Sequence, residues 1–127
     1  VRRPVAVLAT GRPLEDGVSL QFAGLTVDVT HAPGHTEGSV LLGLEGAPEA
    51  AGHEAKRTLF SGDVLLRGGI GRTDLAGGDL SAMVRSLRER VLPLDDDTLV
   101  LPGHGPATSI GRERRTNPYL LQLAEAG

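Results

Sequence analysis

Three times along this 127-residue chain, an apolar run typical of a β-strand ends in small residues and delivers a side chain that can bind a metal ion. The segments VDVTHAPGH, TLFSGD and LVLPGH present His35, Asp63 and His104 in this way. Each strand is a rigid support, and each glycine lets the backbone turn sharply, so that the side chain at the tip points into a cleft. Because zinc and iron accept histidine nitrogen and aspartate oxygen, this layout predicts one metal site built from distant strand ends.

Composition excludes several other classes of protein. The chain has no cysteine, which rules out disulfides and thiolate metal sites. Its formal net charge is −3 and no basic stripe is visible, so we expect no nucleic-acid partner. The basic and then apolar start is too short for a signal peptide, and no long apolar stretch follows, so we expect a cytoplasmic protein without a membrane partner. A hydrophobic fraction of 39% supports one core, and we expect a single, partial domain over residues 1–127.

Short apolar and alternating runs predict several strands. We expect a buried strand at 4–10, a hairpin with one solvated face at 18–22 and 25–31, and further strands at 39–45, 58–62 and 98–103, the last in the chain. Residues 11–17 and 32–38 are typical of turns and loops. Residues 46–57 mix small and charged side chains without a period and predict an exposed loop.

Two helices follow from the spacing of apolar residues. Asp79 is a good N-cap for a helix that ends at Pro93, with an apolar face formed by Leu80, Met83, Val84, Leu87 and Val91. The same spacing turns Arg85, Arg88, Glu89 and Arg90 toward water. A second amphipathic helix is expected in NPYLLQLAEA, with Pro118 near its start or at a kink. The fold class is therefore α+β.

Taken singly, the candidate ligands have ordinary explanations. Asp63 could cap a helix or occupy a turn, and His104 between two glycines could be a turn residue. His53, in the expected loop, and His31, on the hairpin strand, are interpreted as structural. The joint pattern of three strand ends is hard to explain by turn chemistry alone, and it favours the metal site.

Four segments carry a family resemblance: APGHTEGS (32–39), FSGDVLL (60–66), GIGRTDLAGGD (69–79) and LPGHGPAT (101–108). In this order they resemble the metallo-β-lactamase superfamily, and most of all its glyoxalase II-like (hydroxyacylglutathione hydrolase-like) branch. The resemblance implies a four-layer αββα sandwich, here mainly its C-terminal half, with the metal site at one edge of the two sheets. It assigns His35 to one zinc ion, His104 to a second, and Asp63 to a bridge that positions the reacting water.

The same resemblance places a loop containing Arg72, Thr73 and Asp74 near the site. Two roles for Arg72 stay open at this point. Its guanidinium could contact substrate, or it could pair with Asp74 and hold a turn.

The family's first motif, His-x-His-x-Asp-His, is not found in this chain. A suitable strand, PVAVLAT, is followed by Gly11, Arg12 and Pro13 instead. We expect a deletion, a gap closed over missing residues or a natural truncation, with an internal excision favoured because the early strand is retained. Each ion would then keep one histidine and the shared carboxylate, so metal binding is expected to be weak. Apolar strand surface would also be exposed, which a homo-oligomer could cover.

For function, the resemblance implies a hydrolase that cleaves an S-2-hydroxyacyl thioester, such as lactoylglutathione, with metal-activated water. One alternative is a persulfide dioxygenase of the same superfamily with a single iron, in which His104 would not bind the metal. A second alternative is a non-catalytic remnant that keeps the scaffold for packing or assembly. Metal content and a thioester assay separate these hypotheses.

Overall fold

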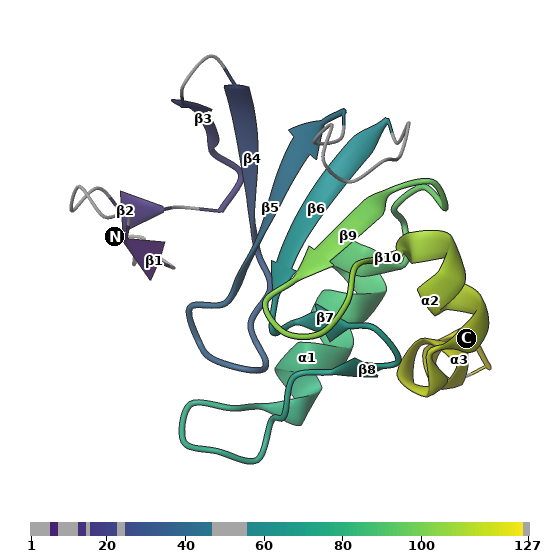
Figure 1. Ribbon diagram of the computed structural model, residues 1–127. Coiled ribbons are helices and arrows are strands. Elements are labelled where there is room, and N and C mark those ends of the chain that lie inside the picture. Colours follow the sequence, from purple (N-terminus) through teal and green to yellow (C-terminus); the bar gives the residue numbers. More distant parts are fainter. Residues whose placement is uncertain (1–5, 8–12, 15, 23–24, 47–55, 126–127) are drawn as a thin grey trace.

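A computed structural model describes residues 6–7, 13–14, 16–22, 25–46 and 56–125 of the chain (Figure 1). Its main feature is a six-stranded sheet in the order β10-β9-β6-β5-β4-β3. The strands are β3 (Ser19–Phe22), β4 (Leu25–His31), β5 (Val40–Glu45), β6 (Arg57–Gly62), β9 (Leu99–Pro102) and β10 (Thr108–Ser109). Two short antiparallel pairs accompany it: β1 (Ala6–Val7) with β2 (Pro13–Leu14), and β7 (Leu65–Leu66) with β8 (Gly69–Ile70).

Strand direction decides which strand ends meet. The neighbours β3, β4, β5 and β6 pair antiparallel, whereas β6 and β9 pair parallel. Strands β4, β6 and β9 therefore run the same way, and their carboxyl ends lie at one edge, the lower end of the sheet in Figure 1. The three predicted ligands follow these three strands.

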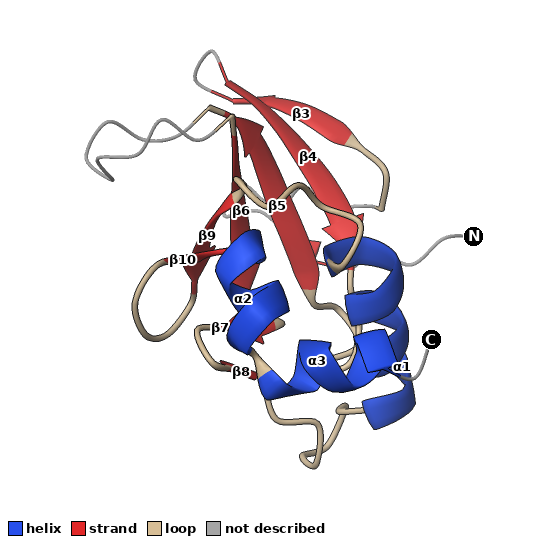
Figure 2. Ribbon diagram, turned by 90° about the vertical axis from the view of Figure 1, so that its right-hand side faces the viewer, coloured by secondary structure: helices blue, strands red, loops and turns tan. Residues whose placement is uncertain are grey.

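Helices cover one face of the sheet (Figure 2). They are α1 (Leu80–Ser86), which continues into the π-helical turn η2 (Leu87–Val91), then α2 (Ile110–Thr116) and α3 (Pro118–Glu125). Alternate residues of the central strands meet them, because side chains on a strand alternate between faces. The resulting core joins sheet and helix residues: Leu41, Leu59, Val100, Met83, Leu87, Val91, Ile110 and Leu120.

The opposite face of the sheet is also apolar. Cross-strand partners line up Val27 with Leu44, Leu42 with Phe60, and Phe60 with Leu101. These side chains are only partly buried, and Phe60 is 38% exposed. Apart from the two short strand pairs, the described residues thus form one six-stranded sheet and one helical layer, the arrangement of half of a four-layer αββα sandwich.

A buried carboxylate ties the helical layer to the rest of the fold. Glu113 of α2 is fully buried, and its Oε1 accepts hydrogen bonds from the Gly68 backbone N–H (2.7 Å) and Asn117 Nδ2 (3.0 Å). Its Oε2 accepts from Thr108 Oγ1 at 2.6 Å. Burial opposes ionisation, yet the hydrogen bonds from Thr108, Gly68 and Asn117, with the charge of Arg112, keep the pKa of Glu113 below its ordinary value.

Most predicted elements are confirmed. The hairpin of β3 and β4, the strands β5, β6 and β9, and the N-cap at Asp79, whose Oδ1 accepts from the Ala82 N–H at 3.1 Å, lie where the pattern placed them. Arg85, Arg88, Glu89 and Arg90 are exposed, as expected. Pro118 opens α3, where its missing N–H costs nothing.

Other expectations were wrong. Leu80 is 62% exposed instead of lying on the buried helix face, because it occupies the first position of α1, beyond the reach of the core. Strand β10 follows the strand expected to be last, and residues 110–116 form a separate helix, capped by Ser109 Oγ at the Arg112 N–H (3.1 Å). Residues 13–14, expected in a turn, pair with β1.

Two expectations fall partly on residues that are not described. The strand predicted at 4–10 is described only at residues 6–7, and residues 47–55 of the predicted loop lie outside the described residues. Within the described part of the chain, no helix has the length and apolar character needed to span a bilayer.

Candidate metal centre

The three predicted ligands come together at the shared strand edge. His35 lies in the loop after β4, Asp63 directly follows β6, and His104 comes two residues after β9. His35 Nε2 is 3.3 Å from Asp63 Oδ2, and His104 Nδ1 is 2.6 Å from Asp63 Oδ1. Each imidazole therefore faces a different oxygen of one carboxylate.

Two glycines next to Asp63 and His104, Gly62 and Gly103, connect the ends of β6 and β9. Gly62 has a φ of +52°, a left-handed conformation that favours glycine, and it turns the chain at the strand end. The Gly103 N–H donates to the Gly62 carbonyl at 2.8 Å. A β-carbon at Gly103 would lie 3.3 Å from Asp63 Oδ1, so the absence of a side chain there leaves room for the carboxylate. The paired strand ends place Asp63 beside His104.

The loop before His35 is held against helix α1. Gly34 has a φ of +147°, and a β-carbon there would come within 2.5 Å of Met83. The Gly34 carbonyl accepts from the Asp79 N–H at 2.8 Å, and the Pro33 carbonyl accepts from Ser86 Oγ at 2.7 Å. These contacts fix the backbone that carries His35.

The hydrogen bond of His35 determines which of its nitrogens is free. Its Nδ1 lies 2.9 Å from the backbone carbonyl of Arg72. A carbonyl only accepts, so Nδ1 must carry the proton and, in the neutral ring, Nε2 keeps its lone pair. That lone pair faces Asp63 Oδ2, another acceptor, and a cation between the two atoms would satisfy both. Nitrogen and oxygen donors held this way fit a zinc or iron ion.

His104 is held less firmly. Its Nδ1 donates to Asp63 Oδ1, because the carboxylate only accepts, and its side chain is 77% exposed, against 24% for His35. In the described ranges, no three or more His, Cys, Asp or Glu side chains form a group that could hold one metal ion. Each oxygen of Asp63 has one imidazole beside it, two groups where a zinc site has three or four protein ligands, and His104 would have to exchange its hydrogen bond for an ion.

The guanidinium of Arg72 is engaged within its own loop. Its Nε and one terminal nitrogen donate to the two oxygens of Asp74 at 2.8 and 2.9 Å. The hydrogen bonds from Arg72 lower the pKa of Asp74 to about 2, and the hydrogen bond to Asp74 raises the pKa of Arg72. Of the two roles left open for Arg72, the structure contains the one in which it holds a turn.

Sequence reasoning missed how this loop touches the site. The contact is made by the Arg72 backbone carbonyl, which a side-chain motif cannot reveal, and by the buried Gly71. The segment GIGRTD was the available signal. His31 does not join the site, since its Nε2 donates to the Glu37 carbonyl at 2.7 Å, and His53 lies outside the described residues.

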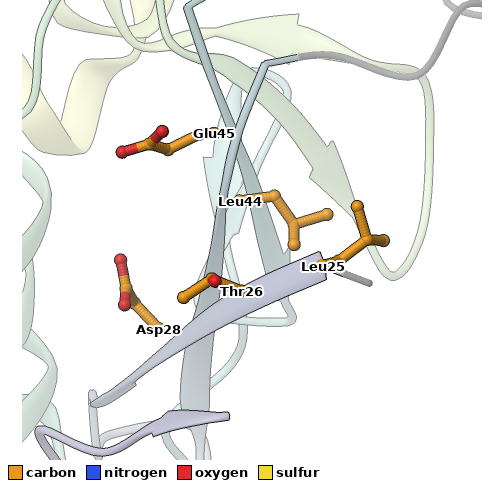
Figure 3. Close-up of a pocket in the computed structure, with 5 residues that line it drawn as sticks. All are labelled: Leu25, Thr26, Asp28, Leu44 and Glu45. Carbon is orange, nitrogen blue, oxygen red and sulfur yellow. The ribbon is translucent and has the colours of Figure 1, made fainter. Parts of the chain in front are cut away.

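A cavity of about 370 Å³ lies elsewhere, at the other end of the sheet. Leu25, Thr26, Asp28, Leu44 and Glu45 line it (Figure 3). Asp28 is already engaged there, by Ser19 Oγ at 2.7 Å and by Arg57 at 3.1 Å. None of the three candidate ligands lines this cavity.

Comparison with known proteins gives a family match. The family model described as the metallo-beta-lactamase superfamily matches residues 2–104. An uncharacterized protein of Mycobacterium tuberculosis is 44% identical over 97% of this chain and 52% of its own length. Hydroxyacylglutathione hydrolase GloC of Haemophilus influenzae is 43% identical over 84% of this chain and 46% of its own length. The human mitochondrial persulfide dioxygenase ETHE1 is 32% identical over 88% and 42%.

Solved structures agree with the sequence relatives. TTHA1623 in a di-iron-bound form has a TM-score of 0.66 and 46% identity, covering 86% of this chain and 48% of that one. ETHE1 from Myxococcus xanthus has a TM-score of 0.73 and 30% identity, covering 94% and 53%. The chain thus spans about half the length of the relatives that it matches.

Proposed function

The chain belongs to the metallo-beta-lactamase superfamily, and from this premise we propose that it carries half of the active site of a glyoxalase II-like thioester hydrolase. The observation that supports the proposal most is the pair of imidazoles on the two oxygens of Asp63. We assign His35 and His104 to different metal ions and Asp63 to the bridge. Identity to GloC, at 43%, favours an S-2-hydroxyacyl thioester as substrate.

The residues of the site would divide the work as follows. When bound, zinc or iron ions polarise a carbonyl and lower the pKa of water so that it can attack near neutral pH. Asp63 holds its carboxylate between the two imidazoles and would fix the separation of the ions. His35 presents Nε2 from a constrained ring. The exposed ring of His104 lies at the open side of the site, where a substrate can enter.

One alternative is supported by a specific observation. The human persulfide dioxygenase ETHE1 is 32% identical to this chain, and ETHE1 from Myxococcus xanthus is 30% identical. An iron-dependent reaction with persulfide is therefore the second candidate. In that case His35 and Asp63 would bind iron and His104 would not. The higher identity to GloC ranks the hydrolase first.

The test measures both reactions on the same protein. The chain is loaded with zinc or with iron and assayed for S-lactoylglutathione hydrolysis and for oxygen uptake with glutathione persulfide, alongside His104→Ala. Zinc-dependent hydrolysis that is lost in His104→Ala supports the proposal. Oxygen uptake with iron and no hydrolysis would replace it with the dioxygenase. Metal binding with neither reaction would leave a non-catalytic scaffold, and equal hydrolysis in both proteins would exclude this site as its source.

We further propose that the apolar face formed by Val27, Leu42, Leu44, Phe60 and Leu101 packs against a second sheet. Each longer relative has as much sequence again as this chain matches, enough for the other two layers. That half would also supply the further ligands that each ion needs. Light scattering should detect a one-to-one complex when the part of GloC that this chain does not match is added. A stable dimer of this chain alone would instead assign the face to a second copy.

A further inference from the structure

The two imidazoles of the site differ in how the protein holds them. The side chain of His35 is 24% exposed and that of His104 is 77% exposed. His35 also has a partner outside the site, the Arg72 carbonyl at 2.9 Å. The segment 71–79, which we name the histidine loop, accounts for this difference.

Gly71 brings the histidine loop into direct contact with the site. It is buried, and a β-carbon at this position would lie 2.9 Å from His35 Nδ1 and would overlap the Asp63 backbone carbonyl. Real β-carbons do not approach other atoms so closely. Only glycine therefore lets the chain lie this close to both the His35 ring and the Asp63 backbone and place the next residue's carbonyl on the ring.

The Arg72–Asp74 pair fixes the direction of that carbonyl. The accepting oxygen belongs to the peptide between residues 72 and 73, which lies inside the ring closed by the pair. Both carboxylate oxygens of Asp74 are used, at 2.8 and 2.9 Å, and such a two-point contact constrains orientation as well as distance. Rotation of the 72–73 peptide would move Arg72 and Asp74 relative to each other and would work against this two-point contact.

The far end of the loop returns to the same histidine. The Asp79 N–H donates to the carbonyl of Gly34, the residue before His35, at 2.8 Å. Near that end, Gly78 lies against the Thr73 carbonyl, where a β-carbon would overlap it. The histidine loop thus contacts the ring of His35 at its start and the backbone beside His35 at its end.

We propose that the histidine loop is a positioning device, in which Arg72 and Asp74 hold His35 in the Nδ1–H tautomer with Nε2 aimed at Asp63 before any ion binds. Arg72 and Asp74 act through His35 and do not touch the substrate. A ligand held in advance loses less freedom when it binds, and outer partners of metal-bound histidines contribute about 10- to 100-fold to metal affinity. The expected change in metal affinity rests on the proposed function, in which His35 binds an ion. The tautomer does not, because it is a property of the metal-free chain.

The first experiment reads the tautomer directly. Nitrogen-15 NMR of the metal-free chain at pH 8 should show the His35 proton on Nδ1. In Asp74→Ala, the His35 signals should move toward the tautomer mixture of an unrestrained imidazole, and the double variant Arg72→Asp with Asp74→Arg should restore them. Asp97→Ala is the matched control, because it removes the same charge from an exposed position. Asp97 precedes the start of β9, whereas His104 follows its end, so the spectrum should stay unchanged.

The second experiment measures zinc binding by calorimetry in the same variants. Asp74→Ala should weaken binding about tenfold, with recovery in the double variant and no change in Asp97→Ala. An Nε2–H tautomer of His35 in the unaltered chain would overturn the inference. So would an Asp74→Ala variant in which neither the His35 tautomer nor the zinc affinity changes. Absence of zinc binding in every variant, with the tautomer changes as described, would overturn the proposed function and leave the positioning of His35 established.

Discussion

Two carboxylates in this molecule hold several elements together, but their partners differ. Glu113 is fully buried and accepts from three neutral donors, at 2.6 to 3.0 Å. Asp63 has a side chain 29% exposed and is flanked by two imidazoles. One of these, His35, donates from Nδ1 to the Arg72 carbonyl, so in the neutral ring its Nε2 turns a lone pair toward the carboxylate.

The comparison separates a structural carboxylate from a functional one. The Gly68 N–H, the Thr108 hydroxyl and the Asn117 amide all donate to Glu113. The protein itself therefore stabilises the buried carboxylate. Asp63 accepts from His104 at one oxygen, but its other oxygen lies 3.3 Å from His35 Nε2, which is an acceptor in the neutral ring. Folding does not require such an arrangement, whereas a bound cation would make use of it. The predictions below change one carboxylate at a time.

The largest effect is expected at Glu113. Glu113→Ala removes the acceptor of the buried Thr108 hydroxyl and opens a cavity, whereas Asn117 Nδ2 keeps the Gly69 carbonyl at 3.1 Å. The free energy of unfolding should fall by about 3 kcal/mol, since an unsatisfied buried group costs about 1–3 kcal/mol and the cavity adds to it. Urea denaturation measures the loss. Glu113→Gln keeps the shape and an acceptor oxygen, so it should lose less than half as much. A loss below about 0.5 kcal/mol in Glu113→Ala, the range of neutral surface changes, would break the comparison.

At Asp63 the effect should fall on metal binding instead of stability. Asp63→Asn removes the shared charge, and zinc affinity should drop about 100-fold, or about 2.7 kcal/mol. The amide can donate to His35 Nε2, which the carboxylate cannot, so the free energy of unfolding should stay the same or rise slightly. Calorimetry and urea denaturation of one sample give both quantities. Unchanged zinc affinity, or a stability loss like that of Glu113→Ala, would contradict the distinction.

Gly71→Ala tests the contact between the two ligands. Its β-carbon would overlap the Asp63 carbonyl and touch His35, so we expect a loss of about 1–3 kcal/mol in the free energy of unfolding, as for overpacked sites. Gly69→Ala is the matched control, because a β-carbon there meets nothing within 4 Å. It should change stability by less than about 0.5 kcal/mol. Equal stability of the two variants would show that the segment can move aside.

The smallest effect is the acid dependence of Glu113. Because its folded-state pKa lies below the ordinary value, its contribution to stability is complete above the ordinary glutamate pKa and is lost as the pH falls through the folded value. Urea denaturation from pH 7 to pH 3 should therefore show a steeper fall in the unaltered chain than in Glu113→Gln. Parallel curves would mean that the hydrogen bonds do not favour the charged form.

The sequence predicted the strand edge better than it predicted the buried network. His35, Asp63 and His104 each follow a short apolar run and a glycine, and that local pattern survives folding because β4, β6 and β9 run in one direction. Glu113 lies in the run RERR, which is typical of a solvated surface. Thr108 and Asn117 lie five residues before and four residues after it, but Gly68 lies 45 residues away, and nothing in the charged run itself marks these contacts.

Contacts made by backbone groups were also not predicted from the sequence. The family resemblance placed the loop with Arg72, Thr73 and Asp74 near the site, and the pairing of Arg72 with Asp74 was one of two open roles. What reaches His35 is a peptide carbonyl, which every residue possesses and no sequence pattern marks. The metal roles of His35, Asp63 and His104 stay proposals until an ion is seen.

The most direct test is anomalous X-ray diffraction from zinc-soaked crystals of this chain. The shared-carboxylate site predicts an ion about 2.0–2.2 Å from both His35 Nε2 and Asp63 Oδ2, the usual zinc bond lengths, with His104 beside the other oxygen of Asp63. Zinc bound only elsewhere, or bound to His35 through Nδ1 with the Arg72 contact broken, would contradict it.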